Sequence, residues 1–204
     1  MTWLEKGVDA LALGYAILFF PAPLFWIAIH PAIHFWRRFG NRSFWIALPI
    51  WAICGTALVF LRHGIFAHRV GRNALTVVAG LGLIALALWI GRSVHRQFGL
   101  KRLGGLPEVS PGRYPGGVVS SGIYGLVRHP RYVEYMLTFL GLALLTGAWG
   151  VFLLAFATIL LYYVVAPLEE RELREQYGTQ YEGYARAVPR FIPRLGRKTK
   201  PQQS

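Results

Sequence analysis

Hydrophobic residues run along this chain in five long blocks that are separated by short polar and basic segments. The blocks cover about residues 8 to 29, 44 to 61, 74 to 91, 132 to 147 and 149 to 166. A helix needs about 20 apolar residues to cross the roughly 30 Å of hydrocarbon in a bilayer, and the blocks approach or reach that length. The pattern therefore predicts an all-α, polytopic membrane protein with about five transmembrane helices.

The polar residues between and after the last two blocks predict how the end of the chain is arranged. Gly147, Ala148, Trp149 and Gly150 form an uncharged turn, so short that the two blocks must be antiparallel neighbours. The run EERELREQYGTQYEGYA, from Glu169 onward, has the periodicity of an amphipathic helix. We expect this helix to extend the fifth span outside the membrane and to end at Pro189.

The charge of the chain favours a membrane protein over a nucleic-acid-binding one. Of its 204 residues 54% are hydrophobic, and 22 lysines and arginines oppose nine acidic residues. A net charge of +13 on such an apolar chain indicates contact with anionic lipid headgroups before RNA or DNA. Across the predicted spans, 18 of the lysines and arginines fall on one side and four on the other. This asymmetry puts the N-terminus outside and the C-terminus in the cytoplasm.

Three segments follow from this layout. Residues 1–91 hold the first three predicted spans, residues 92–194 a core of loop, hairpin and C-terminal helix, and residues 195–204 a basic tail that we expect to be disordered. The single cysteine, Cys54, excludes a disulfide framework. No metal site is expected either, because His30 and His34 have no third ligand nearby and are interpreted as interfacial histidines.

The tripeptide Arg128-His129-Pro130 stands directly before the fourth block. A proline disfavours helix for the preceding residue and suits the first helical position, so the helix should begin at Pro130 with His129 at its N-cap. Free backbone N–H groups and the Arg128 guanidinium would then converge on a carboxylate or a phosphate. The alternative is that the basic residues only anchor the helix in lipid headgroups.

Two adjacent carboxylates, Glu169 and Glu170, follow the fifth block on the same predicted side as the tripeptide. They oppose the helix macrodipole and each other, although a solvated charged face would account for them too. Tyr162 shares a helix face with Glu170, either toward a ligand or as an interfacial aromatic. A pocket with an anion-binding helix start on one wall and carboxylates on the other suits a zwitterion that also carries a cation, such as S-adenosyl-L-methionine.

The order of motifs RHPRY, apolar hairpin, EERELREQYG, QYEGY and VPRFIP resembles the isoprenylcysteine carboxyl methyltransferase family and the wider set of integral-membrane methyltransferases, including phospholipid N-methyltransferases. VVSSGIYGLV, upstream of RHP, fits as well, and the resemblance covers about residues 95 to 194. It implies a methyltransferase that faces the cytoplasm and binds S-adenosyl-L-methionine. The cofactor residues that it implies are Val118, Val119, Tyr124, His129, Pro130, Arg131, Tyr132 and Glu170.

The resemblance also implies roles around the methyl acceptor. Arg128 would support the cofactor carboxylate or orient the acceptor, and Glu169 would lie near the acceptor. From the residues themselves we expect Glu169 to position or deprotonate the acceptor, with His129 as a second candidate base. We expect Tyr162 to contact substrate from the helix face that it shares with Glu170. Members that methylate carboxylates carry an arginine four residues before this glutamate, where this chain has Val165. The acceptor, lipophilic or small, therefore stays open among carboxylate, thiol, amine and hydroxyl.

Two other functions remain as alternatives. A membrane reductase of the sterol-reductase type has similar C-terminal motifs and uses NADPH, although such proteins are usually about twice as long. A non-enzymatic membrane protein could use the basic surface to hold anionic lipid. The glycine-rich turn of soluble methyltransferases is missing, because Gly80 and Gly82 lie inside a predicted span and are expected to be close-packing points between helices. The sequence leaves the oligomeric state open.

Overall fold

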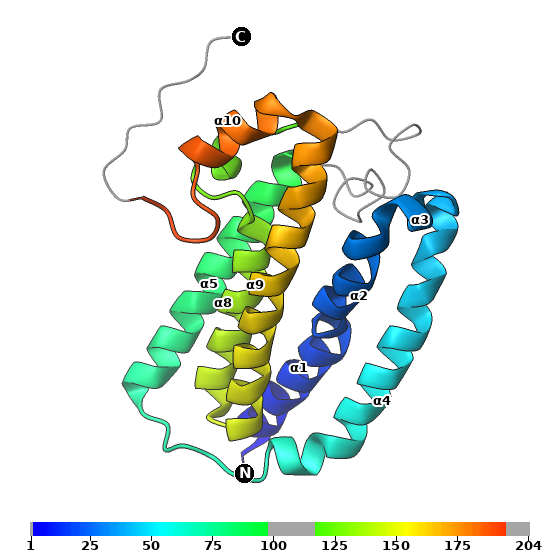
Figure 1. Cartoon of the computed structure of the whole chain (residues 1–204). Helices are drawn as coiled ribbons and strands as arrows, with labels where there is room; N and C mark the ends of the chain where they lie inside the picture. Colours follow the sequence, from blue (N-terminus) through cyan, green and yellow to red (C-terminus); the bar gives the residue numbers. More distant parts are fainter. Residues whose placement is uncertain (1, 98–116, 195–204) are drawn as a thin grey trace.

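The computed structural model describes residues 2–97 and 117–194, and in these two ranges it is all-helical with no strand (Figure 1). Residues 98–116, within the loop expected in the segment 92–194, and the whole basic tail lie outside the described residues. In chain order the helices are α1 (Trp3–Phe19), α2 (Pro21–Ile29), η1 (His30–Ala32), α3 (Ile33–Arg37), η2 (Gly40–Ile46), α4 (Ala47–Ile65), α5 (Ala74–Gln97), η3 (Gly122–Gly125), α8 (Pro130–Thr146), α9 (Trp149–Tyr177) and α10 (Thr179–Ala187).

The long helices form a bundle in which α8 packs against α5, α9 and α1, while α4 packs on the outer side of α1 and α2 (Figure 1). One apolar cluster joins α1, α8 and α9 and includes Ala16, Phe139 and Ala155, which are at most 1% exposed. α10 crosses the end of α9 and lies over the start of α8 (Figure 1). This end of the bundle, where α2, α8, α9 and α10 meet, holds the candidate active site.

The glycines of α5 have different surroundings. A Cβ on Gly80 would lie 2.9 Å from the carbonyl oxygen of Gly141 on α8, so the two backbones touch there. Gly82 has no such neighbour within 4 Å. The expectation of close packing is confirmed at Gly80 and is wrong at Gly82, because only Gly80 lies on the side of α5 that faces α8.

Within residues 2–97 and 117–194, four helical segments are long and apolar enough to cross a membrane by length and composition: Trp3–Arg37, Gly40–Ile65, Ala74–Gln97 and Trp149–Tyr177. They correspond to four of the five predicted spans. The remaining predicted span, the fourth along the chain, is formed by α8. This helix has 17 residues and a length of about 26 Å, slightly less than the hydrocarbon thickness. The all-helical membrane architecture is therefore confirmed, while the count of five spans and the orientation of the termini stay predictions.

Two expected continuous helices are interrupted. The first block holds α1 and α2, which meet at Phe20 because Pro21 lacks an N–H donor and begins a new helix. The amphipathic helix that was expected to run to Pro189 is broken at Gly178, whose φ of +51° favours glycine and redirects the chain into α10. The predicted hairpin turn is confirmed, since α8 ends at Thr146 and Gly147, with φ +63°, leads into α9.

Candidate active site

The start of α8 forms one side of the site. α8 begins at Pro130 with His129 as its N-cap, as the sequence predicts. The backbone N–H of Arg128 donates to the carbonyl of Pro189 at 2.8 Å, and that of His129 donates to the carbonyl of Arg190 at 3.2 Å. These two N–H groups are therefore not free for an anion, because the segment after α10 returns across the helix start and accepts both.

A buried carboxylate, Glu170, connects this helix start to the end of α9 and to the C-terminal segment. Glu170 is completely buried and accepts hydrogen bonds from Arg128 Nη2 at 2.8 Å and Arg190 Nη2 at 2.8 Å, and its Oε1 lies 3.1 Å from His129 Nε2. Arg174, one turn further along α9, adds a contact at 3.2 Å. Glu170 thus holds three chain segments together and does not line the cavity described below.

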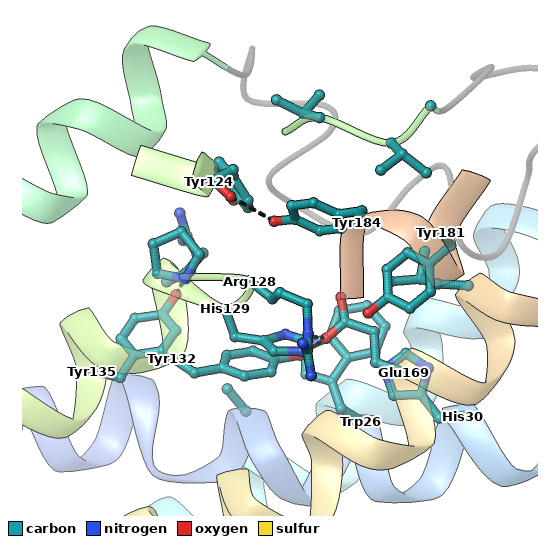
Figure 2. A pocket seen from close by; sticks show the side chains of 17 residues that line it. Trp26, His30, Tyr124, Arg128, His129, Tyr132, Tyr135, Glu169, Tyr181 and Tyr184 are labelled. Atoms are coloured by element: carbon teal, nitrogen blue, oxygen red, sulfur yellow. Dashed lines mark hydrogen bonds and ion pairs between the residues drawn. The ribbon is translucent and has the colours of Figure 1, made fainter. Parts of the chain in front are cut away.

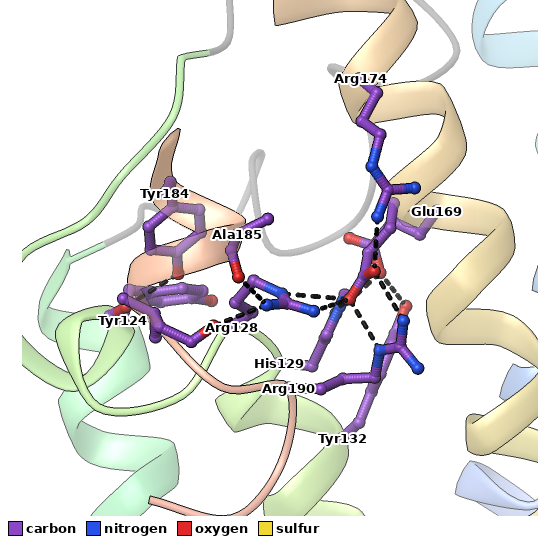
Figure 3. A network of polar contacts seen from close by, with 11 residues as sticks. Tyr124, Arg128, His129, Tyr132, Glu169, Arg174, Tyr184, Ala185 and Arg190 are labelled. Carbon is purple, nitrogen blue, oxygen red and sulfur yellow. Dashed lines mark hydrogen bonds and ion pairs between the residues drawn. The ribbon is translucent and has the colours of Figure 1, made fainter. Parts of the chain in front are cut away.

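The remaining donor nitrogen of the Arg128 guanidinium binds the end of α10. Its Nη1 donates to the carbonyls of Ala185 and Val188, both at 2.6 Å, at the end of α10. In the same part of α10, the hydroxyl of Tyr184 donates to the carbonyl of Tyr124 at 2.8 Å. Arg128 reaches the cavity wall, but its guanidinium is engaged in tying α10 to α8 (Figure 3).

Glu169, the neighbouring carboxylate, faces a different way. Its Oε2 accepts a hydrogen bond from the Tyr132 hydroxyl at 2.7 Å and lies 3.2 Å from His129 Nδ1. Its side chain is 23% exposed and lines the cavity. Adjacent residues on a helix point about 100° apart, so one glutamate supports the wall while the other borders the open space.

His129 therefore lies between two carboxylates, with Nδ1 toward Glu169 and Nε2 toward Glu170. Burial lowers the pKa of His129, but the charge of Glu169 and the hydrogen bonds to both glutamates outweigh burial and raise the pKa above its ordinary 6.5. As an imidazolium, His129 donates both N–H groups and has no nitrogen left to accept a proton.

A cavity of about 220 Å³ opens between α2, the start of α8, the end of α9 and α10 (Figure 2). The sequence-predicted residues that line it are Arg128, Val118, Val119, Tyr124, His129, Pro130, Arg131, Tyr132 and Glu169. Tyr162, which we expected to contact substrate, is fully buried behind the cavity, with its ring stacked on Tyr132 at 4.4 Å. Most of the predicted site is thus brought together, without Glu170 and Tyr162.

The cavity also has walls that sequence reasoning did not assign, from Trp26 and His30 of the N-terminal half and from Tyr181 and Tyr184 of α10 (Figure 2). The motif QYEGY contains the two tyrosines, so the sequence does carry a signal for this wall of the cavity. Trp26 and His30 are four residues apart in an apolar run that resembles any membrane span.

Three side chains on the cavity wall carry a buried polar atom with no hydrogen-bond partner among the described residues. They are His30 Nε2, Arg131 Nη1 and the Tyr181 hydroxyl. Arg131 is otherwise held by its Nε, which donates to the Tyr135 hydroxyl at 2.8 Å. Buried polar groups are nearly always paired, so such atoms around a cavity are typical of a site that takes a polar ligand.

Comparison with known proteins agrees with this arrangement. The family model described as "Phospholipid methyltransferase" matches residues 75–180. A methanethiol S-methyltransferase of Pseudomonas deceptionensis is 32% identical over 133 residues, which are 63% of this chain and 48% of that protein. One from Crocosphaera subtropica is 41% identical over 76 residues, 37% of this chain and 29% of the relative.

A protein-S-isoprenylcysteine O-methyltransferase of Schizosaccharomyces pombe is 37% identical over 78 residues, 37% of this chain and 33% of that protein. In each of these relatives the matched part is less than half of the protein's length. No solved structure matches the chain. The family match begins at residue 75, near the start of α5, and covers half of the chain. The chain therefore belongs to the phospholipid methyltransferase family of integral-membrane methyltransferases.

Proposed function

We propose that this protein is an S-adenosyl-L-methionine-dependent methyltransferase that acts at the cytoplasmic membrane face on a lipophilic or small acceptor. Family membership supports methyl transfer. The excess of lysine and arginine on the side that carries the cavity supports the cytoplasmic orientation. When bound, the cofactor supplies a methyl group that is activated on a sulfonium.

The observation that carries the proposal is the chemistry of the cavity wall. Glu169 supplies a carboxylate beside the ring of Tyr132, and Arg131 supplies a buried guanidinium nitrogen that has no hydrogen-bond partner in the part of the chain that the structure describes. A carboxylate next to aromatic faces suits an ammonium or a sulfonium, and a guanidinium suits a carboxylate. These groups fit a ligand that carries two cationic groups and one anionic group, as the methionine part of the cofactor does.

The contacts suggest a division of work among the site residues. Arg131 binds the cofactor carboxylate in place of Arg128, whose donors are taken by Glu170 and α10. Glu169, kept ionised by His129 and Tyr132, positions the cationic part of the cofactor against the acceptor. Methyl transfer then depends mainly on alignment and on exclusion of water.

A thiol is the first acceptor to test. Val165 is fully buried in an apolar cluster with Tyr135, so the arginine of carboxylate-methylating relatives has no counterpart at this position. Two of the relatives described above are named methanethiol S-methyltransferase. Both observations favour a small uncharged acceptor over a carboxylate.

The test uses the full chain purified in detergent. We expect saturable binding of S-adenosylhomocysteine, no binding of NADPH, and transfer of label from S-adenosylmethionine to an alkanethiol. Glu169→Gln should lower methyl transfer at least about 10-fold, whereas Glu182→Gln, at an exposed position of α10, should leave it unchanged. Binding of NADPH instead of S-adenosylhomocysteine would point to the reductase alternative. Full methyl transfer by both Glu169→Gln and His129→Ala would overturn the assigned roles.

A further inference from the structure

His30, at the start of η1, is fixed more firmly than an interfacial histidine needs to be. Its Nδ1 lies 2.9 Å from Glu172 Oε2 on α9, and Glu172 is itself paired with Arg37 Nη2 at 2.5 Å. The ring of Trp26 stacks on the imidazole, with 5.0 Å between the ring centres. The side chains of His30 and Glu172 are 1% and 5% exposed. Contacts from α9 and α2 therefore set the position and the plane of this ring, and Arg37 of α3 holds Glu172 in place.

The other ring nitrogen of His30 is buried and has no hydrogen-bond partner among residues 2–97 and 117–194. His30 nevertheless lines the cavity, close enough to Glu169 for a charge on the imidazole to act on that carboxylate (Figure 2). A carboxylate that accepts from Nδ1–H selects the tautomer in which Nε2 carries the lone pair. In that tautomer Nε2 is the ring nitrogen left to accept a proton, on a residue that lines the cavity.

The other groups on the cavity wall are less suited to take a proton. Both nitrogens of His129 face carboxylates, and Glu169 is paired with His129 and accepts from Tyr132. A carboxylate stabilised by a cation and a hydrogen bond is a weak base. His30 faces Glu172 and Glu169 of α9, and Glu172 is paired with Arg37 of α3.

We infer that His30 is a catalytic residue, the general base that removes the proton of a thiol acceptor, with Glu172 and Arg37 as its positioning residues. This inference rests on the proposed function. His30 Nε2 takes the proton of the S–H group, and the sulfur electron pair that is released forms the new bond to the methyl carbon. The electron pair of the broken carbon–sulfur bond stays on the donor, which leaves as S-adenosylhomocysteine, and His30 returns its proton to water.

The decisive comparison uses two thiols and one substitution. An alkanethiol is protonated at neutral pH and needs a base, whereas 4-nitrothiophenol is already a thiolate. Asn in His30→Asn can still donate to Glu172 but cannot accept the proton. We expect kcat/KM for the alkanethiol to fall about 100-fold or more, with less than a few-fold change for 4-nitrothiophenol. The remaining alkanethiol activity should rise with pH in proportion to the thiolate fraction.

His34→Asn is the matched control, because His34 lies one turn away, is 75% exposed and contacts the exposed Glu175. It should leave both rates unchanged. Glu172→Gln should reproduce the selective loss in weaker form, since it removes only the partner that orients His30. Equal losses for both thiols in His30→Asn would assign His30 a purely structural role, and unchanged rates would assign it none.

A measurement without cofactor or acceptor completes the test. In protein labelled with nitrogen-15 at histidine, the NMR signals lost in His30→Asn should show Nδ1 protonated and Nε2 unprotonated at neutral pH. The opposite tautomer would overturn the inference. The same holds if the protein binds S-adenosylhomocysteine but methylates neither thiol. Failure of S-adenosylhomocysteine binding would instead overturn the proposed function.

Discussion

Glu170→Gln tests whether one buried carboxylate holds the active site together. The substitution keeps the shape of the side chain and removes its negative charge. Arg128 and His129, whose side chains are 10% and 4% exposed, would keep their positive charges without the carboxylate that balances them. We expect the start of α8, the end of α9 and the C-terminal segment to lose their common anchor.

The size of the effect follows from the exposure of each partner. Breaking a buried ion pair by removing one side typically costs about 3 to 5 kcal/mol. Arg174, at 45% exposure, adds at most about 1 kcal/mol, because water already screens its charge. Since glutamine still accepts hydrogen bonds, we take the lower end, about 3 kcal/mol. For a chain of this length, that corresponds to a fall in Tm of about 6 to 12 °C.

Thermal unfolding in detergent, followed by circular dichroism, measures this fall directly. Glu182→Gln is the control, because Glu182 makes a 3.8 Å contact with Arg186 on the surface of α10, and surface pairs contribute less than about 1 kcal/mol. Equal Tm values for the two variants would refute the assignment of Glu170 as a structural anchor. They would also reopen the possibility that Glu170 contacts the ligand.

Two further predictions concern helix packing and pH. Gly80→Val should lower the free energy of unfolding by about 1 to 3 kcal/mol, because the valine side chain would meet Gly141 of α8. Gly82→Val, where a Cβ has no neighbour within 4 Å, should leave the free energy of unfolding unchanged. Equal Tm values for the two variants would contradict the α5–α8 contact. The raised pKa of His129 predicts stabilisation that is complete below pH 6.5 and is lost as the pH rises through the folded-state pKa. Tm measured from about pH 6 to about pH 9 should therefore decline, and the decline should be shallower in His129→Gln.

Much of the architecture can be predicted from local pattern. The start of α8 follows from Pro130, and the hairpin from the uncharged turn at Gly147. Breaks are harder to predict, because Pro21 and Gly178 are tolerated within apolar or amphipathic runs, and only the packing of the following segment decides the new direction.

Local sequence pattern also predicts the candidate site only in part. Sequence places Glu169 and Glu170 opposite the helix start, but their spacing does not say which of them faces the cavity. That choice depends on the rotation of α9, which is fixed by contacts far along the helix. His30 and Trp26 carry no local signal at all, because their roles arise from an approach of α2 to α9 across more than half of the chain.

The return of the C-terminal segment across the start of α8 has a consequence for synthesis. The cavity takes one wall from residues around Trp26 and His30, which leave the ribosome early, and another from Tyr181 and Tyr184, which leave late. Arg190, a main partner of Glu170, comes later still. Until it is made, α9 carries a buried carboxylate that lacks part of its charge compensation. The walls of the cavity and the carboxylate that ties them together are therefore complete only after Arg190 has been made.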